Sequence, residues 1–287
     1  DGPRRARPPV KLRWRFTLAL AVAALVPISV AAVVTRQTIA SNARAEYEAR
    51  RENADAQMKR ELARLGGQLD GALSALADHK LAFSGAILRE LLKDTRDTQY
   101  LLQLGRLAMR GFLLDLFTVT GSEGKSDVVL VSETRAQLGE TDTEVRARAV
   151  QTEGVPYYAL EKIQDGHTVE NVLAIVAARL SRESPMATHS LAIKAGKRVT
   201  EQDLLASVRL ADRVDARVVS PDGVVRIAGK QWDKIATRDA PIRIPLLGHD
   251  KQPVAYVEVA VSDGNLDAVL EQLTLLSAKQ NLQDTQA

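Results

Sequence analysis

The sequence of 287 residues contains no cysteine. It can therefore form no disulfide, no thiolate metal site and no cysteine nucleophile, and this absence agrees with an oxidising compartment without requiring one. Aromatic residues make up only 4% of the chain. Hydrophobic cores must therefore be built mainly from Leu, Val, Ile and Ala.

Recognisable catalytic and metal-binding patterns are also missing from the sequence. The four histidines are isolated and lack metal-ligand spacing such as HExxH. None stands in the complete pattern of a phospho-accepting histidine, and no two carboxylates are paired in a way that suggests hydrolysis. We therefore expect no catalytic residue, no metal site and no cofactor in this stretch, and an exported hydrolase is the least favoured class.

An excess of basic charge is confined to the N-terminus. Residues 1–15 carry six basic side chains and one acid, whereas the rest of the chain has 33 basic and 35 acidic residues. The net charge of +3 therefore reflects the N-terminal segment alone. Because no basic patch interleaved with aromatic residues is present either, we expect no nucleic-acid partner.

What the chain does have is one long apolar run, the uncharged residues Phe16–Val34. A helix of that length spans roughly 28 Å, close to the hydrocarbon thickness of a bilayer. We therefore predict a transmembrane helix over residues 16–35, with the bilayer as a partner. Because basic flanks stay in the cytoplasm, residues 1–15 should form a cytoplasmic tail. The helix would then anchor the protein in the inner membrane, with most of the chain in the periplasm.

The alternative explanation of this run is a cleaved secretory signal peptide. The sequence Val30-Ala31-Ala32 is similar to a small-residue cleavage site. Apolar segments of signal peptides usually span 7 to 15 residues, which is shorter than this run, so a retained anchor is favoured. Either outcome places the rest of the chain outside the cytoplasm.

Residues 36–110 are predicted to form a helical stalk, with one long helix to about residue 80 and further helix over 83–110 that is broken at residues 93–99. Apolar residues recur at steps of three, four and seven, as along one face of a helix. They are Tyr47, Ala54, Met58, Leu62, Leu65, Leu69, Leu73 and Leu76. The stripe has two possible explanations, a homodimer seam or packing against this protein's own globular part, and both remain open. A homodimer is one expected partner.

From Gly111 onward the pattern changes to short β-branched runs separated by turns. A hairpin is predicted from 112–120 and 127–132, and a helix from 141–151 with Thr141 and Glu144 as a capping box. Further strands are predicted at 167–169, 172–180, 189–194, 216–220, 224–228, 241–247 and 254–261, with helices at 200–212 and 265–280. This order of elements predicts an α+β fold, with mixed α/β lobes following the stalk.

Several of these segments carry a family likeness. The strand 114–119, the glycine turn, the strand 128–132 and the stretch 138–142 (LGETD) resemble the corresponding strands and helix start of Cache-type sensor domains. Residues 195–199 and 218–223 (VVSPDG) resemble the second half of the exported sensor region in bacterial membrane histidine kinases of the nitrogen-regulation type.

The resemblance implies an organisation of double Cache type. A membrane-distal PAS-like lobe would span 111–195 and a membrane-proximal α/β lobe 196–263. Residues 264–287 would lead toward a second transmembrane span that is not present here, so the chain would be a fragment. In that family the lobes bind a small molecule and pass the signal through helices to a cytoplasmic effector.

The function that this resemblance implies is ligand sensing by the input region of a two-component histidine kinase, with a response regulator as downstream partner. The same region could instead serve a chemoreceptor or a cyclic-dinucleotide enzyme. An alternative of another class is a membrane-anchored structural or adhesive protein without a ligand.

The candidate ligand-binding residues lie between the short helix and the strands that follow it. A pocket in such a lobe should be mostly apolar with a few converging polar groups. Tyr157 and Tyr158 are the candidates for its lining, with Arg135, Asp142 and Arg179 as charged partners. The alternative is that the tyrosines are packing residues and that Arg179 only ends a strand.

Overall fold

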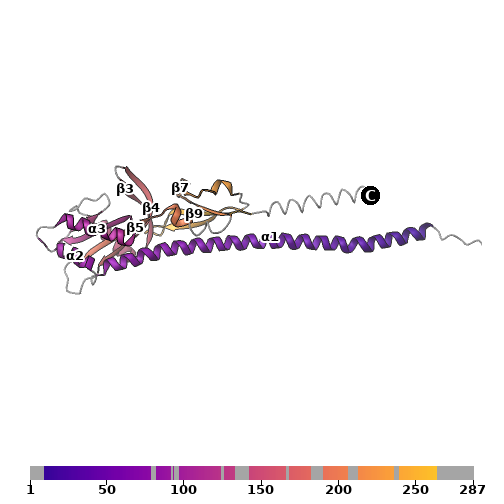
Figure 1. The fold of residues 1–287 in the computed structure, drawn as a ribbon, viewed down its shortest axis with the longest axis horizontal. Helices are drawn as coiled ribbons and strands as arrows, with labels where there is room; N and C mark the ends of the chain where they lie inside the picture. Colours follow the sequence, from indigo (N-terminus) through magenta and orange to yellow (C-terminus); the bar gives the residue numbers. More distant parts are fainter. Residues whose placement is uncertain are drawn as a thin grey trace, which may run out of the picture. The chain divides into compact units, whose positions relative to one another are not determined.

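The computed structural model describes residues 10–78, 82–91, 93, 97–123, 126–132, 142–165, 168–181, 190–205, 213–235 and 239–263 (Figure 1). The chain divides into two compact units. The first comprises residues 1–52 and 263–287, and the second comprises residues 53–262. The order of helices and antiparallel strands confirms the predicted α+β class. Arg135 and the predicted helix 265–280 lie outside the described residues.

The described part of the first unit is the beginning of helix α1, which runs from Val10 to Ala77. Its residues from Phe16 to Val34 are exposed, with Phe16 at 68% and Leu20 at 69%. By length and composition this is the one helix among the described residues that is apolar enough to cross a membrane. Exposed leucine and valine side chains of this density are what a bilayer covers.

The second unit contains a five-stranded antiparallel sheet in the order β2-β1-β5-β4-β3. Its strands are β1 (Leu116–Glu123), β2 (Ser126–Ser132), β3 (Tyr157–Asp165), β4 (Thr168–Ser181) and β5 (Leu191–Arg198). The predicted hairpin is confirmed as β1 and β2. Strand β3 was not predicted, and the two short strands predicted at 167–169 and 172–180 are the single strand β4. We call this sheet and its helix α4 the first lobe.

Helices cover one face of this sheet. The Asn53–Ala77 part of α1 packs there with α2 (Ala82–Leu91) and α3 (Thr98–Phe112). The shared core contains Leu65, Leu69, Leu73, Leu76, Ile87, Leu101, Phe117, Val119 and Ile193. The leucine stripe of α1 is thus buried by this protein's own sheet, which supports the self-packing explanation over a dimer seam. The predicted stalk over 36–110 is made of three helices. Helix α1 ends at Ala77, near the predicted end at about residue 80, and α2 ends at Leu91 while α3 begins at Thr98, in agreement with the break predicted over residues 93–99.

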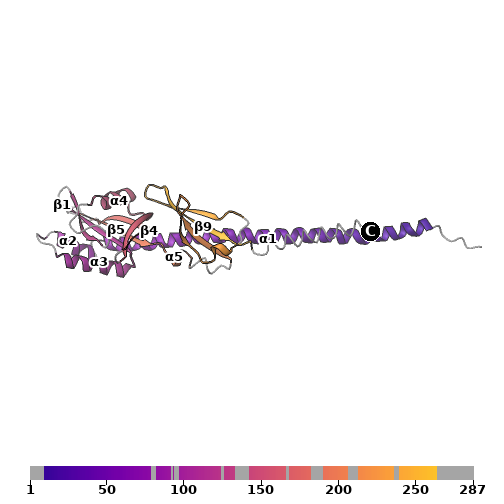
Figure 2. The ribbon, with the colours of Figure 1, turned by 90° about the horizontal axis from the view of Figure 1, so that it is seen from above.

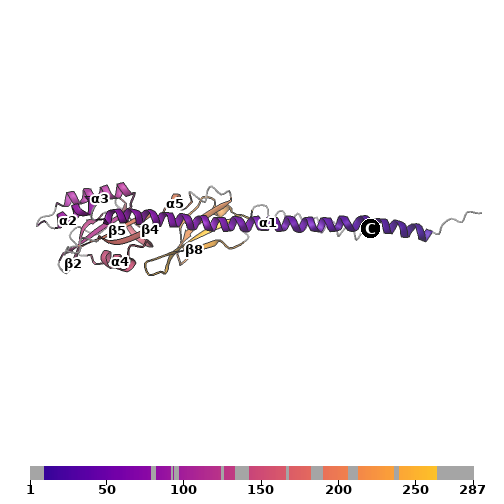
Figure 3. The same ribbon diagram turned by 90° about the horizontal axis from the view of Figure 1, so that it is seen from below.

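The opposite face carries α4 (Glu144–Thr152), as Figures 2 and 3 show by placing α3 and α4 on opposite sides of the strands. Val145 and Ala149 of α4 pack on Ala178 and Ala192 of the sheet. Thr141 of the predicted capping box lies outside the described residues. The helix begins at Glu144, and the side chain of Asp142 accepts the Glu144 backbone N–H at 2.8 Å.

The second lobe, residues 213–263, is a four-stranded antiparallel sheet in the order β7-β6-β9-β8. Its strands are β6 (Val214–Val219), β7 (Val225–Ala228), β8 (Ile242–Leu247) and β9 (Pro253–Val261), with a 3-10 turn at Trp232–Lys234. All four were predicted. The short helix α5 (Glu201–Leu205) precedes this lobe. Strand β5 extends to Arg198, so the first sheet ends later than the boundary predicted after residue 195.

Candidate ligand-binding site

The two candidate tyrosines lie on opposite faces of the sheet. Successive residues of a strand point to opposite sides, and Tyr157 and Tyr158 are neighbours in β3. Tyr157 packs with Leu116 and Val176 on the α4 face, whereas Tyr158 packs against the core beneath α1. The structure therefore does not bring the predicted residues together in one pocket. Asp142 lies with Tyr157, and Arg179 lies with Tyr158.

A cavity of about 450 Å³ opens on the α4 face beside Tyr157. We call it the sheet cavity. Its ionisable lining residues are Asp142, Glu144, Arg148, Tyr157, Glu161, Lys162, Lys194 and His249, and Leu116, Thr118, Val145 and Ala159 are among the others. This volume lies within the range of small-molecule sites. Of these residues only Asp142 and Tyr157 were candidates from the sequence.

Lys194 and Glu161 form an ion pair in the sheet cavity. Lys194 interrupts the apolar strand β5, where it pairs with Thr118 of β1. Its Nζ lies 2.7 Å from Oε1 of Glu161, and the two side chains are only 17% and 19% exposed. An ammonium group has three donors, so Lys194 can bind a further acceptor without releasing Glu161. A lysine between the apolar residues Ile193 and Ala195 is the signal in the sequence that could identify this residue.

Arg148 of α4 forms the wall of the sheet cavity together with His249 of the second lobe. Nη1 of Arg148 lies 2.8 Å from Nδ1 of His249 and also donates to Oε1 of Gln151 at 3.0 Å. A guanidinium group has donors only, so Nδ1 of His249 must be the acceptor and carries no proton. Oε1 of Glu144 lies 3.6 Å from Nε of Arg148.

Tyr157 keeps its hydroxyl proton inside this charged cavity. Its side chain is 6% exposed, and its ring meets that of His249 edge-on, with centroids 5.8 Å apart. Burial, with a smaller contribution from the nearby Glu161, raises the pKa of Tyr157 to about 12, while Arg148 opposes the shift. A neutral phenol of this kind can donate and accept hydrogen bonds at physiological pH.

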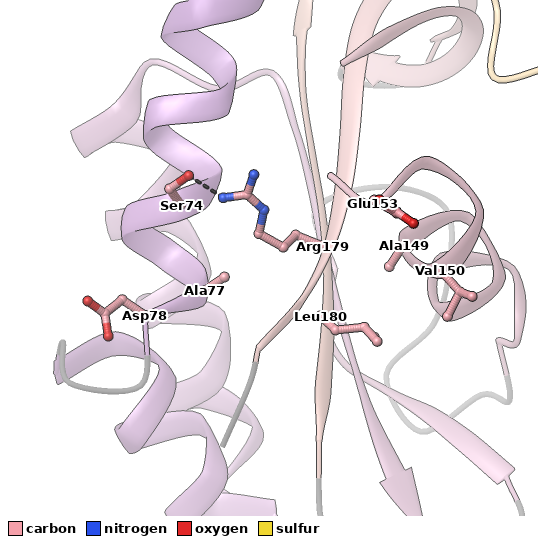
Figure 4. Close-up of a pocket in the computed structure, with 8 residues that line it drawn as sticks. All are labelled: Ser74, Ala77, Asp78, Ala149, Val150, Glu153, Arg179 and Leu180. Atoms are coloured by element: carbon pink, nitrogen blue, oxygen red, sulfur yellow. Dashed lines mark hydrogen bonds between the residues drawn. The ribbon is translucent and has the colours of Figure 1, made fainter. Parts of the chain in front are cut away.

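Arg179 contacts α1 on the other face instead of the sheet cavity. Its Nη2 donates to Oδ1 of Asp70 at 2.8 Å, and its Nη1 donates to Oγ of Ser74. Figure 4 shows Arg179 pointing to α1 while its neighbour Leu180 points the other way. A larger cavity of about 790 Å³ is lined both by α1 and by Ala149 and Val150 of α4, but the guanidinium that lines it is already held by α1.

Tyr158 lies beside this contact with α1. Burial raises the pKa of Tyr158 to about 12. Together with Arg179 and Asp70 it lines a second opening on the α1 face, about 490 Å³ in volume. Arg135, the remaining candidate, lies outside the described residues.

Metal ligands do not converge in the described part of the chain. No group of three or more His, Asp or Glu side chains among those residues could hold a metal ion. The carboxylates of the sheet cavity are instead matched by basic side chains, as the Lys194 and Arg148 contacts illustrate.

No protein-family model matches the sequence, and no curated protein matches it either. Similar solved structures include the periplasmic domain of Vibrio cholerae LuxQ, with 9% identity, a TM-score of 0.43, and coverage of 74% of this chain and 100% of that one. The ligand-binding domain of the Campylobacter jejuni chemoreceptor Tlp3 in complex with L-valine has 8% identity, a TM-score of 0.43, and coverage of 78% and 96%. That of the Pseudomonas aeruginosa amino-acid chemoreceptor PctC in complex with GABA has 10% identity, a TM-score of 0.40, and coverage of 74% and 99%.

These similar structures are periplasmic or ligand-binding domains of other proteins. Which residues bind a ligand, and which ligand, must come from the chain's own cavities and charges.

Proposed function

We propose that this chain is the exported input region of a membrane receptor and that a small polar molecule binds in the sheet cavity. The observation that carries the proposal is the convergence of three acidic and three basic side chains with Tyr157 around a cavity of about 450 Å³. Charged residues are rarely gathered in a partly buried space without a partner or a function.

The charges of the sheet cavity suit a ligand that has both an anionic and a cationic group. Lys194 and Arg148 offer donors to a carboxylate, and Glu161 and Asp142 offer acceptors to an ammonium group. The hydroxyl of Tyr157, which also lines the cavity, adds a neutral donor. A free amino acid is the simplest ligand with this distribution of charge.

Binding can be tested by isothermal titration calorimetry on the full chain in lipid nanodiscs, with free amino acids, dicarboxylates and diamines as separate probes. We expect an amino acid to bind and Lys194→Met to weaken that binding at least tenfold, because a charge-assisted hydrogen bond contributes about 1.5–3 kcal/mol. Lys230→Met, on the exposed surface of the second lobe, is the matched control.

Two results would count against this assignment. Equal binding by the wild type and by Lys194→Met would move the site elsewhere in the molecule. Absence of binding by any probe class would favour the alternative of a membrane-anchored structural or adhesive protein.

Signal transfer would use the contact between β4 and α1. Arg179 ties β4 to Asp70 and Ser74 of α1, the helix whose N-terminal part is the predicted membrane anchor. A ligand that prefers one arrangement of the sheet would shift the helix between two packings, to an extent limited by its differential affinity for them.

The effector on the cytoplasmic side would be a histidine kinase with its response regulator, acting as a homodimer in the inner membrane. A chemoreceptor or a cyclic-dinucleotide enzyme uses the same kind of input region, so these remain alternatives. Fusing residues 1–287 to a reporter kinase through a second transmembrane span would test the kinase alternative. A reporter that does not respond to a ligand bound by the chain would argue against it.

A further inference from the structure

Among the described residues of the second lobe, His249 is the one that lines the sheet cavity. This residue lies in the turn between β8 and β9, and it contacts Arg148 of α4 and Tyr157 of β3. Both contacts join the two lobes within the same compact unit. The protonation state of His249 therefore bears on both the wall of the cavity and the contact between the lobes.

The turn that carries His249 is well fixed. The N–H of Gly248 donates to the carbonyl of Gln252 at 2.7 Å, and the N–H of Gln252 donates to Oδ1 of Asp250 at 3.0 Å. A Cβ at position 248 would lie only 2.9 Å from Cγ2 of Val254, so glycine permits the close approach of the two strands. The imidazole is thus held against Arg148 by a rigid support.

The contact with Arg148 exists only while His249 is neutral. Nδ1 must accept the hydrogen bond from the guanidinium, which leaves the ring proton on Nε2. A second proton would occupy the accepting lone pair and place two cations side by side. Imidazole is the side chain that ordinarily gains a proton between pH 8 and pH 5.

Other ionisable groups surround the same space. They are Arg148 and Glu144 from α4, Tyr157, Glu161 and Lys162 from β3, Lys194 from β5, Asp142 before α4, and Asp250 and Lys251 in the turn itself. Their acidic members are engaged in part, since Glu161 holds Lys194 and Asp142 accepts the Glu144 N–H. Arg148 already has alternative acceptors in Gln151 and Glu144, which it can keep after losing His249.

We propose that His249 is a pH-dependent latch that joins the second lobe to the sheet cavity. In the neutral form it accepts from Arg148 and closes the cavity wall. On protonation the bond is lost, like charges repel, and the second lobe separates from α4. The effect on ligand affinity depends on the proposed function, whereas the separation of the lobes does not.

The latch can be tested without a ligand by measuring the distance between the lobes. The natural chain has no cysteine, so Val155→Cys in the first lobe and Val224→Cys in the second give two unique spin-label sites. Both positions are exposed, at 64% and 50%. Double electron–electron resonance on the full chain in nanodiscs measures the distance between the two labels. When the pH is lowered from 8 to 5, most of the population should shift to a longer distance.

Two histidine variants separate this cause from others. His249→Gln retains an oxygen that can accept from Arg148 but cannot be protonated in this range, so it should keep the short distance at both pH values. The triple variant His79→Gln, His167→Gln and His189→Gln leaves His249 as the one histidine and should retain the wild-type shift.

Three results would overturn the latch. They are no shift in the wild type, a shift that persists in His249→Gln, and loss of the shift in the triple variant. Ligand affinity measured at the same two pH values then tests the consequence separately. If the lobes separate but no probe binds at either pH, the latch stands and the proposed function fails.

Discussion

The two faces of the five-stranded sheet use the same strands for different purposes. On the α1 face, alternate residues such as Phe117 and Ile193 are completely buried under three helices. On the α4 face, the residues next to them, Thr118 and Lys194, line a cavity with paired charges. Because successive residues of a strand point to opposite faces of the sheet, one strand contributes both to the core under α1 and to the lining of the sheet cavity. The comparison predicts that substitutions one residue apart will have different effects.

The largest expected difference in the free energy of unfolding is between substitutions of Phe117 and of Thr118. Phe117 is 1% exposed and meets the ring of Phe83 edge-on at 5.6 Å, so Phe117→Ala should reduce the free energy of unfolding by about 3–5 kcal/mol. Thr118→Val keeps its shape and should cost only about 1 kcal/mol. Thermal unfolding of the full chain in nanodiscs, followed by circular dichroism, measures both. Similar losses for the two variants would contradict the division of roles between the faces.

The next largest effect is the loss of stability at alkaline pH that ionisation of the two buried tyrosines causes. The pKa of Tyr157 is about 12 in the folded chain, against an ordinary value of 10. Its contribution to stability is therefore complete below pH 10, and it is lost as the pH rises toward 12, because the unfolded chain releases the proton first. Two pKa units correspond to about 3 kcal/mol. The alkaline loss of stability should be smaller by that amount in Tyr157→Phe.

The variant Tyr158→Phe compares the α1 face with the α4 face in the same experiment. Burial also raises the pKa of Tyr158 to about 12, so this variant should likewise flatten the decline in stability between pH 10 and pH 12. Only Tyr157 lines the sheet cavity, so only Tyr157→Phe should weaken ligand binding at neutral pH. If Tyr158→Phe weakens binding equally, the ligand lies on the α1 face.

The sequence was sufficient for the class of fold and for most strands, because β-branched runs and turn residues mark them locally. It did not identify β3, where Glu161 and Lys162 interrupt the alternation of apolar residues. In the folded chain Glu161 is stabilised by Lys194, thirty-three positions further along, and no local pattern contains that contact. The helix after Thr141 was predicted, but its start depends on the side chain of Asp142.

The candidate site was predicted only in part for a related reason. The sequence predicts Tyr157 and Tyr158 as one pair because they are adjacent, yet neighbouring residues of a strand point to opposite faces of the sheet. Had β3 been recognised, the same period would have placed Tyr157 with Glu161 and Tyr158 elsewhere. Lys194, Arg148 and His249 come from three distant segments, so their convergence follows from tertiary packing alone.

The smallest expected effect on stability belongs to the contact between β4 and α1. Arg179 and Asp70 are 30% and 47% exposed, so a double-mutant cycle with Arg179→Gln and Asp70→Asn should give a coupling of only about 0.5–1 kcal/mol. Ligand affinity should hardly change, because neither residue lines the sheet cavity. Transmission to α1 should nevertheless fail, which a reporter kinase fused beyond a second span would record as loss of response. A normal response in Arg179→Gln would mean that the signal reaches α1 through its buried leucines instead.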